Sequence, residues 1–268
     1  AYHMFKPTMN YTRGFVNYDF IRGQESDNWK GGSFKHIEDK MKEHVREPVN
    51  HKRHSTLVQY LLNMRDRRNE EDYLCAQVFR KASQWLEDSV DNQPFFLWVD
   101  SFDPHEPWDP PKLYADKYCP DYKGKDFIMP HAAYEGGIKP SQEEIERIKS
   151  LYFGEVTFVD KWVGYLFNKL DELKLWDNTI VMVTSDHGTQ ILDHGSFGKG
   201  ANKLHPFNTR INWLVRHPDI SECSHIDAFV QSHDLMPTAL NLLGIEYTFC
   251  DGVDVWQLVT GETESVRD

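Results

Sequence analysis

The sequence predicts an α/β fold in which a largely parallel sheet is sandwiched by helices. Segments with apolar residues at helical spacing alternate along the chain with short runs of consecutive apolar residues. Such alternation is typical of parallel sheets, whose buried strands read as unbroken hydrophobic runs. The 268 residues, 40% hydrophobic and 13% aromatic, are enough for one large core or two modest ones.

The first half of the chain predicts one long helix and one strand. Residues 1–60 are rich in charge, glycine and histidine, which indicates loops and short strands. A helix is expected from about Glu70 to Asp88, where apolar residues recur at helical spacing. A buried strand is expected at Phe95–Val99. Residues 107–140 hold many prolines, glycines and tyrosines without a period, and they predict a long loop or lid.

The second half predicts two more helices and three strands. One helix opens at Ser141, where Glu144 three residues later completes a capping box, and its apolar stripe runs to Leu170. A later helix, Leu235–Leu243, is closed by Gly244. The strands are expected at 180–183, at 212–215 and, as a short one, at 229–230.

The densest chemical signal lies where the run 180–183 ends. Asp186 and His187 follow it within the sequence Thr-Ser-Asp-His-Gly, and Gly188 permits a turn. Ligands bind at the carboxyl ends of strands in open α/β sheets. A carboxylate beside an imidazole suits a divalent cation. The alternative is a polar strand exit with a helix-capping aspartate.

A glycine-rich stretch with a lysine follows this motif. Asp193-His194-Gly195 is followed by Gly198-Lys199-Gly200. Glycines let the backbone approach an anion closely, and a lysine supplies a point charge for sulfate or phosphate oxygens. Lys199 is therefore a candidate anion-binding residue.

A second cluster follows the expected strand at 95–99. His105 lies between Pro104 and Pro107 in Asp-Pro-His-Glu-Pro-Trp. Prolines fix the backbone on both sides and hold the ring in one direction. Such a histidine suits proton donation to a leaving oxygen or hydrogen bonding to an anion. The alternative is a structural histidine in a proline-rich turn.

Charge and composition exclude some classes of protein. The net charge of −12 argues against a nucleic-acid partner. No apolar stretch approaches the ~20 residues of a membrane span, so we expect a soluble protein, either cytoplasmic or periplasmic/secreted. The four cysteines lack Cys-x-x-Cys pairs and argue against a zinc ribbon. Nothing in the sequence indicates an oligomeric state.

The motifs together resemble the sulfatase branch of the alkaline-phosphatase superfamily. The resemblance rests on Ser-Asp-His-Gly, Asp-His-Gly-x-x-Gly-Lys and Pro-His-x-Pro, and it extends over most of the chain. It implies an alkaline-phosphatase-like fold, with 1–268 as a catalytic domain that hydrolyses a small anionic sulfate ester. It further implies a divalent metal held partly by Asp186 and His187, with His105 and Lys199 as catalytic residues. Calcium is the family's usual ion, and the histidine ligand keeps manganese and zinc open.

The chain also departs from the family pattern. A sulfatase carries a C/S-x-P/A-x-R sequence, whose first residue becomes an aldehyde nucleophile, and an Asp-Asp pair for the metal; neither occurs here. Cys75 and Cys119 lack that setting and are interpreted as structural. We therefore expect an incomplete domain, without the nucleophile segment and the C-terminal subdomain, that is inactive by itself.

Two other functions stay open. One is a phosphodiesterase or phosphonate monoester hydrolase of the same superfamily, which shares the Asp-His and lysine motifs. The other is a non-catalytic anion-binding fragment or pseudoenzyme.

Overall fold

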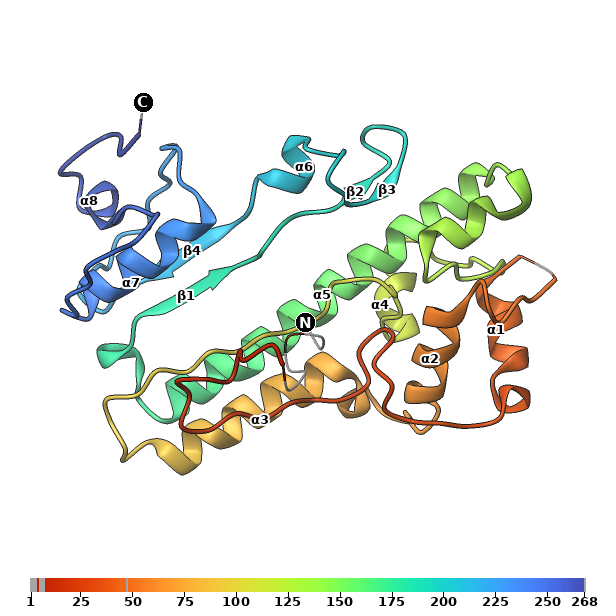
Figure 1. The fold of residues 1–268 in the computed structure, drawn as a ribbon, viewed down its shortest axis with the longest axis horizontal. Helices are drawn as coiled ribbons and strands as arrows, with labels where there is room; N and C mark the ends of the chain where they lie inside the picture. Colours follow the sequence, from red (N-terminus) through yellow and green to blue (C-terminus); the bar gives the residue numbers. More distant parts are fainter. Residues whose placement is uncertain (1–3, 5–7, 47, 268) are drawn as a thin grey trace. The chain divides into compact units, whose positions relative to one another are not determined.

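The structure, a computed structural model, describes residue 4 and residues 8–46 and 48–267 (Figure 1). These residues form two compact units. The first is Ala1–Asp177 with Thr189–Gly200, and the second is Asn178–Gly188 with Ala201–Asp268. Each unit is described by itself below.

The first unit is built mainly from helices. Its elements, in chain order, are η2 (Phe34–His36), α1 (Glu38–His44), α2 (Ser55–Met64), η3 (Glu70–Asp72), α3 (Leu74–Ser89), α4 (Lys112–Asp116), η4 (Pro130–Gly137), α5 (Gln142–Glu172), β2 (Gln190–Ile191) and β3 (Phe197–Gly198). The 3₁₀ helix η5 (Trp176–Asn178) lies where the first unit passes into the second.

The long helix α5 confirms the capping-box prediction. The Ser141 hydroxyl accepts a hydrogen bond from the backbone N–H of Glu144 at 3.2 Å, and the Glu144 carboxylate accepts from the backbone N–H of Ser141 at 2.8 Å. The helix runs along α3 (Figure 1) and also contacts α4. At the α4 contact, a Cβ on Gly154 would lie 2.7 Å from the backbone nitrogen of Ala115, so the close approach requires glycine there.

The core of the first unit gathers apolar side chains from α1, α2, the 107–133 stretch and the first half of α5. Met41, Leu61, Trp108, Ile128 and Ile148 are all buried in it. Each such side chain contributes roughly 1.5–3 kcal/mol through removal from water. This core supports the segment that carries His105.

The prediction of short strands within residues 1–60 is wrong for the described residues, which instead form α1 and α2. Leu57, Val58, Leu61 and Leu62 form the buried stripe of α2. Their spacing is helical, but the surrounding charges and histidines obscured it. The helix expected from Glu70 to Asp88 is confirmed as α3, which begins at Leu74 after a separate 3₁₀ turn.

Residues 107–140 contain α4 and η4 and are anchored to α5. The guanidinium of Arg147, 1% exposed, donates to Asp126 Oδ1 at 2.6 Å and to Asp116 Oδ1 at 2.8 Å. Trp108 and Phe127 of the same stretch are fully buried. The stretch is thus packed against the helices, and a lid function for it stays a prediction.

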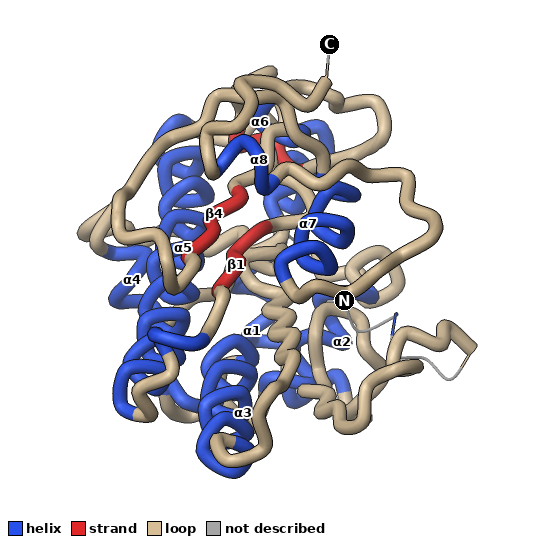
Figure 2. The backbone as a smooth tube through the Cα atoms, turned by 90° about the vertical axis from the view of Figure 1, so that its left-hand side faces the viewer, coloured by secondary structure: helices blue, strands red, loops and turns tan. Residues whose placement is uncertain are grey.

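The second unit contains a two-stranded sheet and four short helices. Its elements are β1 (Val181–Thr184), α6 (Pro206–Thr209), β4 (Trp213–Arg216), η6 (Ser232–Asp234), α7 (Leu235–Leu242) and α8 (Trp256–Val259). β1 and β4 lie side by side (Figure 2). They pair antiparallel, with Val181 opposite Arg216 and Thr184 opposite Trp213. The strands 180–183 and 212–215 and the helix 235–243 are therefore confirmed within a residue or two.

The large parallel sheet is not found among the described residues. Their sheets are β1–β4 and β2–β3, both two-stranded and antiparallel. β1 is half-buried rather than fully buried, since it has a hydrogen-bonded neighbour on one side alone. The α/β class holds, but of the apolar runs from which the parallel sheet was predicted, 180–183 and 212–215 pair antiparallel, and 95–99 and 229–230 form no ladder in the described part of the chain.

The strands expected at Phe95–Val99 and at 229–230 are wrong for the described residues. No ladder hydrogen bonds form at either place. Along 95–99 half-buried residues alternate with the exposed Phe96 and Trp98, so one side of this segment is covered and the other is not. The apolar composition of this segment predicts a strand, but composition does not show whether a partner strand is present.

None of the helices in the described part of the chain combines the length and apolar composition needed to cross a bilayer.

Candidate active site

His105 lies in a tight turn that is fixed from both sides. Its backbone N–H donates to the Phe102 carbonyl at 3.0 Å, and its ring lies 4.2 Å from the Phe102 ring. Trp108, 1% exposed, donates its indole N–H to the Pro104 carbonyl at 3.2 Å. The backbone N–H of Trp108 donates to Ile128 at 2.8 Å. The imidazole is therefore held in one direction while its side chain stays 24% exposed.

Lys199 follows directly on the short strand β3. Phe197 of that strand packs against Trp108 and Tyr134, with ring centroids 6.2 and 6.4 Å apart. Gly198 has a φ of 79°, which favours glycine. This packing brings Lys199 to the turn that carries His105.

The two residues meet at the carboxylate of Glu106. Lys199 Nζ donates to Glu106 Oε2 at 2.9 Å, and His105 Nδ1 lies 3.6 Å from the same oxygen. His105 Nδ1 also lies 2.5 Å from the Glu106 backbone carbonyl, so a proton on this nitrogen would be donated there and Nε2 is left for another partner. Burial alone would raise the pKa of the Glu106 carboxyl. The positive charges of His105 and Lys199 outweigh burial and lower that pKa below its ordinary value.

Asp186 and His187 lie in the second unit, just beyond the end of β1. Asp186 Oδ1 accepts from the backbone N–H of His187 at 2.8 Å, and its side chain is 87% exposed. His187 Nδ1 lies 2.8 Å from the Gly188 carbonyl, which suits the tautomer with hydrogen on Nδ1. Nε2 then keeps its lone pair, and it lies 3.6 Å from Asp186 Oδ2.

Close packing around Gly188 requires a glycine at this position. Its φ lies outside the left-handed region, and its N–H donates to the Asn208 carbonyl at 2.9 Å. A Cβ at this position would lie 2.1 Å from the Phe207 carbonyl oxygen.

Comparison with known proteins agrees with these motifs. The family model described as Sulfatase matches residues 11–245. The chain belongs to the sulfatase family.

Relatives of this sulfatase-family chain include enzymes of several names. It is 26% identical to an arylsulfatase of Clostridium perfringens, over 71% of this chain and 43% of that protein. It is 30% identical to the multifunctional alkaline phosphatase superfamily protein PehA of Trinickia caryophylli, over 60% of this chain and 37% of that protein. The chain thus spans about two fifths of the length of these curated relatives.

Solved structures resemble the sulfatase chain to a similar extent. The putative sulfatase yidJ of Bacteroides fragilis matches with a TM-score of 0.57 and 26% identity, over 70% of this chain and 41% of that one. A phosphonate monoester hydrolase of Silicibacter pomeroyi matches with a TM-score of 0.57 and 22% identity, over 75% and 44%. The second likeness shows the fold alone.

The sequence predicts Asp186 and His187 as metal ligands of this sulfatase-family chain. Their donor atoms fit a divalent cation, because an exposed carboxylate lies beside an imidazole nitrogen whose ring is oriented by the Gly188 carbonyl. Within residues 8–46 and 48–267, no group of three or more His, Cys, Asp or Glu side chains is placed to hold a metal. The two residues would therefore supply part of a coordination sphere.

Sequence reasoning missed Glu106, and it also missed a buried charged cluster beside the His105 turn. Arg67 forms a short ion pair with Asp109 and donates to the Tyr60 hydroxyl at 3.2 Å. The guanidinium also lies 3.9 Å from the centre of the Tyr73 ring. Asp109 lies just beyond the turn that carries His105. The ion pair between Arg67 and Asp109 therefore fixes the C-terminal end of that turn.

The pKa values of two further carboxyl groups of this cluster are raised. Burial raises the pKa of Asp103 to about 6, although a hydrogen bond from the Cys75 backbone N–H at 3.2 Å opposes this. Burial, together with the charges of Asp103 and Asp109, raises the pKa of Glu155 well above its ordinary value. Among the described residues, Glu155 Oε2 has no hydrogen-bond partner. When the Glu155 carboxyl is protonated it is neutral, so it needs no positively charged partner.

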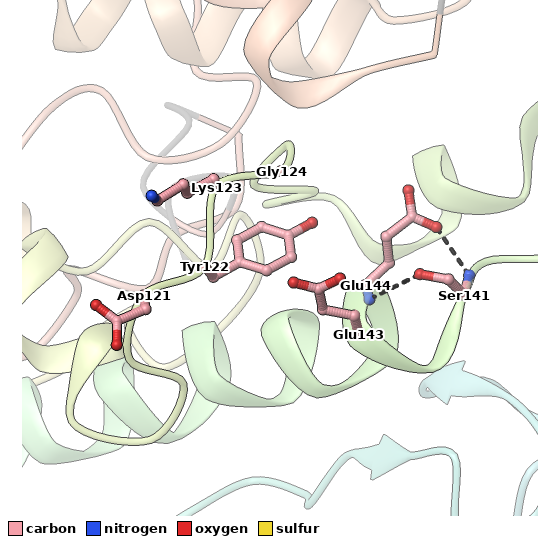
Figure 3. A pocket seen from close by; sticks show the side chains of 7 residues that line it. All are labelled: Asp121, Tyr122, Lys123, Gly124, Ser141, Glu143 and Glu144. Atoms are coloured by element: carbon pink, nitrogen blue, oxygen red, sulfur yellow. Dashed lines mark hydrogen bonds between the residues drawn. The ribbon is translucent and has the colours of Figure 1, made fainter.

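A hollow of about 630 Å³ elsewhere in the first unit is not this site (Figure 3). Ser141 and Glu144, on its wall, cap α5 through the hydrogen bonds drawn there. The residues that line it are Asp121, Tyr122, Lys123, Gly124, Ser141, Glu143 and Glu144, none of which the motifs predict to act in catalysis.

Proposed function

We propose that this protein hydrolyses sulfate monoesters. One observation carries the proposal: Lys199 and His105, from motifs 94 positions apart, both approach Glu106, at 2.9 and 3.6 Å. Membership of the sulfatase family supports it. The substrate is a small sulfate ester, whose negative charge a lysine recognises.

Lys199 and His105 would both act at the leaving oxygen of the sulfate ester. The ammonium of Lys199 would neutralise charge that develops on the sulfate and the leaving oxygen. His105 Nε2, left available by the Nδ1 contact with the Glu106 carbonyl, would give a proton to the leaving oxygen. With both groups in place, the leaving group would depart as a neutral alcohol rather than as an alkoxide.

We further propose that Asp186 and His187 hold a divalent cation, calcium first, with manganese and zinc as alternatives. Such an ion would supply Lewis-acid charge to the sulfate oxygens. His187 suits it because its Nδ1 is occupied by the Gly188 carbonyl and Nε2 is left for the ligand bond.

The metal assignment is tested by metal content. Asp186→Ala in the whole protein should lower bound metal and turnover together, because it removes a charged ligand. Asp193→Ala is the matched control, since Asp193 accepts from the backbone N–H of Ile191 at 3.0 Å. Equal metal content in Asp186→Ala and wild type would refute the assignment.

The hydrolytic proposal is tested by leaving-group dependence. His105→Ala should slow the hydrolysis of alkyl sulfates, whose leaving oxygen needs a proton, by about 10²–10⁴-fold. It should slow activated aryl sulfates far less. An equal loss on both classes would contradict proton donation. The 268 residues assayed alone should give no turnover, because the C/S-x-P/A-x-R sequence does not occur among them.

A phosphonate monoester or phosphodiester hydrolase is the second candidate function. The fold likeness to phosphonate monoester hydrolases and the relative named as multifunctional favour it. A panel of nitrophenyl sulfate, phenylphosphonate monoester and bis-nitrophenyl phosphate compares the candidates by kcat/KM. A whole protein that binds the metal but hydrolyses none of the panel would instead be a non-catalytic anion-binding protein.

A further inference from the structure

Glu106 contacts both of the residues to which the family motifs assign the chemistry. Its Oε2 accepts from Lys199 Nζ at 2.9 Å and lies 3.6 Å from His105 Nδ1. We propose that Glu106 is a positioning residue, whose carboxylate holds the Lys199 ammonium beside the His105 ring so that both act on one substrate oxygen. For its catalytic consequence this inference rests on the proposed sulfate-ester hydrolysis.

The backbone that carries Glu106 is rigid enough for this task. The Trp108 side chain is 1% exposed, and its indole N–H donates to the carbonyl of Pro104, two residues before Glu106. The backbone N–H of Trp108 is bonded to Ile128 at 2.8 Å. A side chain can position another only if its own base does not move, and the turn meets that condition.

Lys199 needs such a partner because its own attachment is loose. It follows Gly198, and its side chain has four rotatable bonds that burial does not fix, since 25% of it is exposed. A lysine ammonium has three N–H donors, and Glu106 occupies one of them. Two donors are left for substrate oxygens, so the ion pair orients the lysine without consuming it.

The Lys199–Glu106 pair is partly buried rather than fully exposed. The side chains of His105, Glu106 and Lys199 are 24%, 22% and 25% exposed. In the same unit, Lys169, 16% exposed, pairs with Glu87, 41% exposed, and also with Glu172. Glu87 is therefore a matched control: a glutamate paired with a lysine by a helix surface, with no part in the candidate site.

The first test does not depend on turnover. Lysines of the folded protein are acetylated briefly with acetic anhydride, and the extent at Lys199 is measured by peptide mass spectrometry. Glu106→Gln keeps the shape of the side chain and removes its charge, and it should raise the labelling rate of Lys199 about threefold to fivefold, as expected for a modest ion pair. Glu87→Gln should leave Lys199 labelling unchanged. No change at Lys199 in Glu106→Gln would overturn the proposal.

The second test uses the whole protein and alkyl sulfates. Glu106→Gln should lower kcat by about 10-fold to 100-fold with little change in KM, because a misplaced group loses catalysis more than binding. Glu106→Asp, which keeps the charge, should recover part of the loss. In a Lys199→Ala background, Glu106→Gln should lower kcat by less than about twofold, because the lysine that Glu106 positions is absent.

The outcomes separate this inference from the proposed function. If Glu106→Gln lost the same factor with and without Lys199, Glu106 would be structural and the inference would fail. If wild type hydrolysed no sulfate ester, the proposed function would fail, and the acetylation result would decide the positioning role by itself.

Discussion

Asp103→Asn tests whether the buried carboxyl groups beside the His105 turn control how stability depends on pH. Asp103 Oδ2 accepts from the Cys75 backbone N–H at 3.2 Å. Asparagine keeps a carbonyl acceptor of the same shape in that place and cannot ionise. The substitution therefore removes one titratable carboxyl group and keeps the local hydrogen bond.

The magnitude follows from the raised pKa of Asp103. Burial raises it from its ordinary value of 3.8 to about 6. Each tenfold step in the ionisation equilibrium is 1.36 kcal/mol, so ionising this carboxyl costs the folded protein about 3 kcal/mol. Between pH 3.8 and about 6 the folded state binds more protons than the unfolded state, and stability falls as pH rises. Glu155, whose pKa is also raised, extends the fall to higher pH.

The assay is urea unfolding followed by tryptophan fluorescence between pH 4 and 8. Near pH 4 the variant and wild type should be about equally stable, and near pH 7.5 Asp103→Asn should be more stable by up to about 3 kcal/mol. Asp91→Asn, at an exposed position after α3, is the matched control and should follow the wild-type curve. A variant with the wild-type slope, or one less stable at pH 7.5, would refute the reasoning.

Three other substitutions test particular contacts by urea unfolding. Gly188→Ala should cost about 1–3 kcal/mol, because its methyl group would lie 2.1 Å from the Phe207 carbonyl oxygen; an unchanged midpoint would contradict that clash. Ser141→Ala should cost about 1 kcal/mol through loss of the cap of α5, with Ser141→Asn as the variant that restores it; equal stability of the two would count against the cap. Asp234→Ala should lower the urea midpoint, because it removes the acceptor of the Gln231 and Val253 backbone N–H groups as well as the partner of Arg267; an unchanged midpoint would exclude a structural role for this carboxylate.

The helices with local signals were predictable from the sequence. The start of α5 follows from a serine and a glutamate three residues apart, and the end of α7 from Gly244, whose φ is 65°. Strand pairing was not predictable, because a ladder depends on hydrogen bonds between residues far apart. Phe95–Val99 has the composition of a strand and lacks a partner among the described residues.

The candidate site was partly visible in the sequence. His105 and Lys199 stand in short motifs whose residue types indicate their chemistry. Glu106 lies inside one of these motifs, but its role depends on a contact with a lysine 93 positions away. The Arg67 cluster was invisible for the same reason, since it joins residues from α2 to α5. Spacing along the chain does not reveal such contacts.

The buried ion cluster of Arg147 limits how the sequence can change. Loss of either Asp116 or Asp126 would leave a guanidinium that is 1% exposed without one of its two carboxylate partners. Loss of Arg147 would leave Asp126 without this guanidinium, and Asp116 with Lys112 as its partner at 3.1 Å. Each single replacement is costly, whereas an apolar replacement of all three of similar volume can be close to neutral. Among homologous chains these three positions should therefore change together, and an alignment in which they vary independently would show that the charges do not act as a set.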